Sequence, residues 1–246
     1  MIEDYVAIDL EMTGLNAKTD HILEVAAVRI RKGKETAFFS AVVNPKVHLS
    51  EDITTLTGIT GQEAENGADL DETLSAFLEF LGEDILVGQN IIFDYSFLKQ
   101  WAVNHKIILE KKAVDTLKLA RIFLPKEQKK NLGSLCTYFE VERVNAHRAL
   151  EDVRETVQIF EKMKAVYGEK QPDAFEPKPL IYKAKKQTPA TPQQLRYLNR
   201  FAAYYRIEIP ELSQALTRSE ASRITDQIIS RYGRGPKRET KRQIWP

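Results

Sequence analysis

Apolar runs near the start of the chain predict three strands in one sheet. Residues 5–10 form a nearly continuous apolar stretch that ends in carboxylates, which is typical of a buried strand. Further apolar runs at 22–31 and 36–43 flank a Lys-Gly-Lys sequence, which is typical of a tight turn. Strands connected in this way form a meander, so the three segments are expected to lie side by side.

Helical spacing of apolar residues begins further along the chain. It predicts a helix over 71–82, whose apolar face carries Leu74, Phe77, Leu78 and Leu81. A short buried strand at 85–87 follows, and Asn90 is expected to cap the next helix, whose apolar side carries Phe93, Phe97, Leu98 and Trp101. The remaining elements are a strand leading into a helix at 113–116 and helices at about 131–139 and 147–167. This order predicts an α/β fold, a mixed β-sheet flanked by helices.

The character of the chain changes after residue 168. Residues 171–192 contain five of the ten prolines, with lysines between them, so 169–190 is expected to be an extended Pro/Lys-rich linker. Two capping boxes, at Thr191 and Thr217, predict a small C-terminal helical module over 191–232. The basic tail at 233–246 is expected to be disordered. The main domain is expected to cover 1–168.

Composition excludes several classes of protein. The 246 residues are 43% hydrophobic and 29% charged, which fits a globular domain with a small appendage. A single cysteine, Cys136, excludes an internal disulfide framework and a four-cysteine zinc site. No apolar run reaches membrane-spanning length, and the acidic N-terminus is unlike a signal peptide. The protein is therefore expected to be soluble and cytoplasmic, with no membrane partner.

The formal net charge of +1 combines two regions of opposite charge. Residues 1–168 hold 20 Lys and Arg against 27 Asp and Glu, a balance of −7. Residues 169–246 hold 16 against 8, a balance of +8. Such asymmetry indicates an anionic partner, and a basic extension would strengthen phosphate binding in a salt-dependent way. The alternative is an extension that only aids solubility.

Two carboxylates end the first predicted strand. Residues two apart on a strand project to the same side, so Asp9 and Glu11 are expected to point the same way. Adjacent carboxylates repel each other unless a cation lies between them, and oxygen ligands suit Mg²⁺ or Mn²⁺. The pair is therefore a candidate metal site, and the alternative is a solvated strand end.

Asp94, Asp152 and His147 are further candidates. Asp94 lies one turn into a predicted helix, where an acidic residue also complements the helix dipole. His147 and Asp152 are five positions apart, so they meet in one site only if His147 precedes or begins its helix. A histidine with an ordinary pKa of about 6.5 suits a general base, and the alternative is a structural or exposed side chain.

Together these segments resemble the DnaQ-like DEDDh 3′–5′ exonucleases. The resemblance rests on three ordered motifs, DLEMTGL at 9–15, QNIIFD at 89–94 and HRALED at 147–152. It extends to the intervening segments ILEVAAV at 22–28, VDT at 114–116 and NLGSL at 131–135. It covers about residues 3–168 and is strongest to the proofreading group, which comprises the epsilon subunit of bacterial DNA polymerase III and the exonuclease domain of PolC-type polymerases.

This sequence departs from the family pattern at two positions. Met12 occupies a position where the family often has threonine, and Gln89 one where it commonly has histidine. These departures concern local substrate contacts and leave the carboxylates and the histidine in place.

The resemblance implies a ribonuclease H-like fold and a two-metal hydrolysis of phosphodiester bonds. Asp9 would bridge two divalent cations, Mg²⁺ or Mn²⁺, while Glu11 and Asp152 would hold the ion that activates water. Asp94 would hold the second ion. His147 would accept the proton of the attacking water, which gives a 5′-mononucleotide and a shortened 3′ end.

The resemblance also places substrate contacts. Thr13, Gly14 and Leu15 would lie beside the terminal nucleotide, although Gly14 could equally serve a tight turn. Phe93 and Phe97 are candidates for stacking on a base, with packing in the core as the alternative.

Three functions remain open at this point. The first is a metal-dependent exonuclease acting on single-stranded DNA 3′ ends, in replication proofreading or repair, with a separate DNA polymerase as a candidate partner. The second applies the same chemistry to RNA ends, because nothing in the motifs reads the 2′-OH group. The third is a non-catalytic, polymerase-associated interaction subunit, and the presence of all five site residues counts against it.

Overall fold

The computed structural model describes residues 1–143, 148–213 and 215–234. The chain divides into two compact units, 1–185 and 186–246. Within the described ranges, no helix is both long and apolar enough to cross a membrane.

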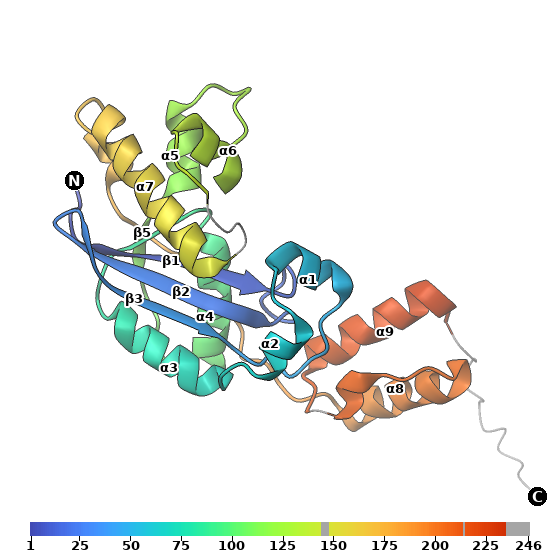
Figure 1. The fold of residues 1–246 in the computed structure, drawn as a ribbon. Coiled ribbons are helices and arrows are strands. Elements are labelled where there is room, and N and C mark those ends of the chain that lie inside the picture. Colours follow the sequence, from blue (N-terminus) through green and yellow to red (C-terminus); the bar gives the residue numbers. More distant parts are fainter. Residues whose placement is uncertain (144–147, 214, 235–246) are drawn as a thin grey trace, which may run out of the picture. The chain divides into compact units, whose positions relative to one another are not determined.

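A mixed sheet of six strands forms the centre of the first unit (Figure 1). Its order is β3-β2-β1-β4-β5-β6. The strands are Tyr5–Met12 (β1), Ile22–Arg31 (β2), Lys34–Val42 (β3), Leu86–Gly88 (β4), Lys112–Asp115 (β5) and Lys178–Pro179 (β6). The first three strands pair antiparallel, as a meander requires, whereas β4 and β5 run parallel to β1. The carboxyl ends of β1, β4 and β5 therefore lie at one edge of the sheet, the edge where sheets of this kind bind ligands.

Side chains of β1 alternate between two cores. Val6, Ile8 and Leu10 pack in one cluster with helices α3 (Leu70–Leu81) and α4 (Ile92–Asn104). Tyr5 and Ala7 pack in a second cluster with α5 (Thr116–Phe123), α6 (Leu132–Tyr138) and α7 (Ala149–Tyr167). Figure 1 shows α7 across one face of the sheet and α3 against the other. The predicted mixed sheet flanked by helices is confirmed.

Two short helices were not predicted from the sequence. They are α1 (Glu51–Thr57) and α2 (Gly61–Glu65), capped by the side chains of Ser50 and Thr60. With seven and five residues, they are too short to display a helical repeat of apolar positions.

The predicted helix cap at Asn90 is wrong. Helix α4 begins at Ile92, and its N-cap residue Ile91 makes no side-chain capping hydrogen bond. Asn90 instead has a φ of 58°, and its N–H donates to Asp115 Oδ1 at 3.0 Å. Asparagine tolerates this left-handed conformation better than most residues. Asn90 therefore turns the chain from β4 into α4.

The linker expected at 169–190 is folded in its first half. A short 3₁₀-helix, η1 (Pro172–Phe175), buries Phe175 in the core beside α7, and β6 pairs with β5. Leu180 is buried in the opposite cluster. Proline lacks an amide donor but is tolerated on an edge strand such as β6. Two apolar residues among the prolines thus extend the first compact unit beyond residue 168, to Lys185.

The second unit contains helices α8 (Pro192–Tyr205) and α9 (Arg218–Tyr232), with the 3₁₀-helix η2 (Pro210–Ser213) between them. Both predicted capping boxes are present, Thr191 with Gln194 and Thr217 with Glu220. The helices enclose a small core of Leu198, Phe201, Ile209, Leu216, Ala221, Ile224 and Ile228. From residue 235 onward, the expected basic tail lies outside the described residues.

Candidate active site

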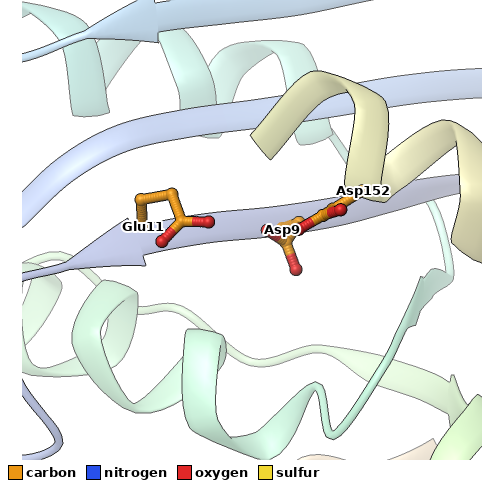
Figure 2. Close-up of side chains that lie close together, drawn as sticks. All are labelled: Asp9, Glu11 and Asp152. Carbon is orange, nitrogen blue, oxygen red and sulfur yellow. The ribbon is translucent and has the colours of Figure 1, made fainter. Parts of the chain in front are cut away.

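Three carboxylates meet at the carboxyl end of β1. Asp9 and Glu11 project from one side of the strand, and Asp152 reaches them from the first turn of α7 (Figure 2). One oxygen atom of each side chain lies within 4.8 Å of the other two. Asp9 and Glu11 are half-buried and Asp152 is buried. The structure therefore brings together three of the predicted metal-binding side chains.

A buried glutamate holds the start of α7 against the sheet. Glu24, on β2, is 2% exposed, and its carboxylate accepts a hydrogen bond from the backbone N–H of Ala149 at 3.1 Å. The same carboxylate accepts from the Arg148 guanidinium at 3.2 and 3.3 Å. An anion at a helix N-terminus satisfies a backbone donor and complements the helix dipole. Glu24 thereby fixes the helical turn that carries Asp152.

Burial and mutual repulsion disfavour the charged forms of the two β1 carboxylates. The pKa of Asp9 lies well above its ordinary value, first because of burial and then because of the nearby charges of Asp94, Asp152 and Glu11. Burial also raises the pKa of Glu11 to about 8, with added repulsion from Asp152 and Glu24. The Arg148 guanidinium opposes this shift at Glu11.

The predicted fourth carboxylate, Asp94, lies apart from the three-oxygen cluster but within electrostatic range of Asp9. It is 4% exposed, in the first turn of α4, and its Oδ1 accepts from the backbone N–H of Leu10 at 3.2 Å. Burial raises the pKa of Asp94 to about 8, against the lowering effect of that hydrogen bond.

This set of donors fits a hard divalent cation. Carboxylate oxygens are the ligands that Mg²⁺ and Mn²⁺ prefer, and crowded carboxylates are stabilised when a cation lies between them. The raised pKa values of Asp9 and Glu11 reflect how strongly the site resists further negative charge. Asp9, Glu11 and Asp152 could hold such an ion.

An arginine contacts one carboxylate of the cluster. The Arg143 Nη2 atom donates to Asp152 Oδ1 at 2.7 Å, and its Nε atom lies 2.8 Å from Oε2 of Glu155. Glu155 lies on α7, its side chain is 4% exposed, and it also accepts from Cys136 Sγ. Arg143 therefore supplies the positive charge that two buried carboxylates on α7 require.

The loop after β1 is held by its own contacts. Thr13 Oγ1 accepts from the backbone N–H of His21 at 2.9 Å. A Cβ atom at Gly14 would lie 2.4 Å from Oδ2 of Asp20, so only glycine fits there without movement of that side chain. Leu15, in contrast, is 84% exposed. The packing of the loop is thus enough to explain Gly14, while Leu15 is presented to solvent.

The two phenylalanines of α4 differ in burial. Phe97 is 3% exposed in the core, and Phe93 is half-buried with its ring centroid 5.5 Å from that of Phe97. The predicted general base, His147, belongs to residues 144–147 and lies outside the described residues.

Sequence reasoning missed three charged residues that support the site: Glu24, Arg143 and Glu155. For Glu24 a signal existed, because a carboxylate in the middle of the apolar run 22–28 must find a partner when the strand is buried. Glu155 likewise interrupts the buried face of α7. Arg143 offered no local signal, since its partners lie 9 and 12 positions away.

Comparisons with known proteins agree with this architecture. The sequence model of the Exonuclease family (RNase_T) matches residues 6–160, more than half of the chain. The PolC-type DNA polymerase III of Bacillus subtilis (strain 168) is 39% identical over 166 residues, which cover 65% of this chain and 11% of that protein. The chain thus spans about a tenth of the length of the curated relatives that it matches.

Solved structures extend the likeness to the fold. The nuclease domain of 3′hExo, a DEDDh family member bound to rAMP, superposes with a TM-score of 0.58 at 19% identity, over 72% of this chain and 96% of that one. Exonuclease X in complex with 5′ overhanging duplex DNA gives a TM-score of 0.55 at 22% identity, over 69% of this chain and 98% of that one. These likenesses confirm the ribonuclease H-like fold expected from the motifs. With the family model matched from residue 6 to residue 160, the chain belongs to the Exonuclease family.

Proposed function

We propose that this protein is a metal-dependent 3′–5′ exonuclease that releases 5′-mononucleotides from DNA 3′ ends. The observation that carries the proposal is the cluster of Asp9, Glu11 and Asp152, whose oxygens lie within 4.8 Å of one another on the scaffold of an exonuclease family. This cluster is suited to binding divalent cations, which can in turn bind the oxygens of a phosphodiester substrate.

Each acidic residue has a proposed role. Asp9 would contact two divalent cations, Mg²⁺ or Mn²⁺, with Glu11 and Asp152 completing one site and Asp94 contributing to the other. Two such ions supply stabilisation of the charge that builds on the attacking and leaving oxygens. Glu24 and Arg143 would keep Asp152 in place during turnover, through the contacts described above.

His147 is proposed as the general base that takes the proton from the attacking water. An imidazole ring that accepts a proton near neutral pH is suited to this task. Thr13, Gly14, Leu15 and Phe93 are proposed to contact the terminal nucleotide, with exposed Leu15 and half-buried Phe93 the side chains most able to touch a base.

The biological setting is proposed from the relatives. The matched curated proteins are PolC-type DNA polymerases III, which favours DNA as substrate, a role in replication proofreading or repair, and a DNA polymerase as partner. A cytoplasmic location accords with that role. We assign catalysis to the first unit.

A substrate panel tests the proposal. The full chain is incubated with Mg²⁺ or Mn²⁺ and with single-stranded DNA, paired DNA, DNA with a mismatched 3′ end, and RNA. We expect stepwise shortening from the 3′ end of single-stranded DNA, release of 5′-mononucleotides, and no reaction in EDTA. Faster degradation of RNA than of matched DNA would replace the proposal with an exoribonuclease, and inactivity on all four would leave a non-catalytic role.

A further inference from the structure

The acidic first unit contains one strongly basic stretch. Residues 111–130 hold seven Lys and Arg but only two acidic residues, a balance of +5. The rest of 1–168 holds 13 basic and 25 acidic residues, a balance of −12. Positive charge is therefore concentrated in β5, in α5 and in the loop that follows α5.

Part of this stretch lines an open cleft of about 620 Å³. Its positive groups are Arg121, Lys126 and Lys130, and its amides include Gln89, Asn90 and Asn131. Among the described residues that line it, none is acidic and none is aromatic. We call this feature the basic cleft.

The walls of the basic cleft are fixed by hydrogen bonds. Asp115 Oδ1 accepts from the backbone N–H groups of Asn90 and Leu117, both at 3.0 Å, and so ties the end of β4 to the start of α5. The Gln89 side chain donates to the backbone oxygen of Lys130 at 2.8 Å. The ammonium group of Lys130 donates to two backbone oxygens of its own loop. The cleft is thus preformed.

Two of the three cations are not used for folding. Arg121 and Lys126 are exposed, and within the described residues neither makes a side-chain hydrogen bond or ion pair. Lys130, in contrast, serves to hold the loop. Two uncompensated cations beside several amide groups are suited to phosphate oxygens.

The basic cleft lies at the same edge of the sheet as the carboxylate cluster. Gln89 and Asn90 follow β4, and Leu117 follows β5, while Asp9 and Glu11 end β1. These strands are neighbours and run parallel, at about 5 Å per step across the sheet, so the carboxyl ends of β1 and β5 are separated by on the order of 10 Å. A nucleic-acid strand covers that distance in about three nucleotides at about 3.4 Å each.

We propose that the basic cleft binds the phosphodiester backbone of the substrate strand, a few nucleotides upstream of the 3′ end that enters the carboxylate cluster. The identity of the bound strand as the substrate rests on the proposed function. The binding of a nucleic-acid strand in the cleft does not. Because the cleft offers cations and amides without an aromatic ring, it contacts phosphates and does not stack on bases. Binding there is independent of sequence.

The test reverses the two uncompensated charges in the full chain, as Arg121→Glu/Lys126→Glu. Its matched control is Lys112→Glu/Lys170→Glu, an equal charge change at exposed positions that do not line the cleft. Activity is measured on an oligothymidylate of about twelve nucleotides and on the p-nitrophenyl ester of thymidine 5′-monophosphate, which is too short to reach the cleft.

We expect KM for the oligonucleotide to rise at least about tenfold in the cleft variant and to change far less in the control. The kcat value should stay within about twofold, and hydrolysis of the ester should be unchanged. An equal rise of KM in the control would overturn the proposal, and so would a parallel loss of ester hydrolysis.

A binding arm keeps the inference separate from catalysis. Affinity for fluorescein-labelled oligothymidylate is measured in EDTA over a range of salt concentrations, with oligouridylate of equal length alongside. The slope of log affinity against log salt should fall by about 1.4 in the cleft variant, or about 0.7 per lost phosphate contact, for both polymers. An unchanged slope refutes the cleft as a phosphate site even if the protein proves to have no nuclease activity.

Discussion

The carboxylate cluster and the basic cleft occupy one edge of the same sheet, yet they differ in charge and in burial. The cluster is crowded and largely buried, and its groups raise one another's pKa values. The cations Arg121 and Lys126 are exposed and carry no partner among the described residues. In the proposed mechanism the cluster binds a phosphate through cations, whereas the cleft carries positive charge of its own. The two proposals thus place binding of the strand and reaction at its end in separate parts of the site, so the reaction should depend on the metal and the binding on the salt concentration.

The largest effect should come from neutralising the cluster at Asp9. Asp9→Asn keeps the shape of the side chain but removes a carboxylate that interacts electrostatically with Asp94 and Asp152. Loss of several kcal/mol of charge stabilisation predicts a fall in kcat of about three orders of magnitude. Oligonucleotide affinity in EDTA should be retained, because the substitution adds no negative charge and leaves the basic cleft unchanged. A variant that keeps substantial metal-dependent turnover would show that chemistry does not depend on this cluster.

A smaller effect distinguishes Arg143, which pairs with buried carboxylates, from the exposed Arg121: the change in the free energy of unfolding when each is removed. Arg143→Ala leaves the buried carboxylates of Asp152 and Glu155 without their cation, so the free energy of unfolding should fall by roughly 2–3 kcal/mol. Arg121→Ala, at an exposed position that makes no ion pair with the described residues, should change it by less than about 0.5 kcal/mol. Urea denaturation of both variants measures the difference. Equal stabilities would mean that Arg143 does not compensate the buried charges.

The smallest effect is a pH dependence confined to the cluster. The pKa of Glu11 is about 8 in the folded chain and about 4.5 when unfolded, so between these values the folded form holds a proton that the unfolded form releases. In EDTA, stability should therefore decline as pH rises from about 5 to 8, and Glu11→Gln should remove part of that decline. The melting temperature of Glu11→Gln should exceed that of the unmodified chain by at least about 2 °C at pH 8. A constant difference between pH 5 and pH 8 would contradict the raised pKa.

Much of the first unit follows from local patterns in the sequence. The strands β1 and β2 are apolar runs, and the period of two places Asp9 and Glu11 on one side of β1. The long helix α7 carries its period clearly, and both capping boxes of the second unit form as expected. In these elements the signal lies within about one helical turn or one strand of the residue concerned.

What the sequence concealed depends on partners far along the chain. Asn90 looked like a helix cap, but its backbone N–H donates a hydrogen bond to Asp115, 25 positions later. Phe175 and Leu180 looked like linker because prolines surround them, yet each finds a core built from earlier residues. The basic cleft was hidden for a different reason. The acidic remainder of 1–168 cancels the positive balance of 111–130 in the net charge of that region.

The hydrogen bond between Leu10 and Asp94 gives the fourth carboxylate a structural task. Strand β4 pairs with β1 only at Val6 and Ala7, so the Leu10 N–H lies beyond the strand ladder on that side and takes Asp94 Oδ1 as acceptor. Oδ1 thus links α4 to β1, a task separate from the cation binding proposed for Asp94. Asp94→Asn preserves the acceptor that anchors α4 to β1 while it removes the charge. The anchoring of α4 and the cation binding proposed for Asp94 can therefore be tested separately by exchanging a single oxygen for an NH₂ group.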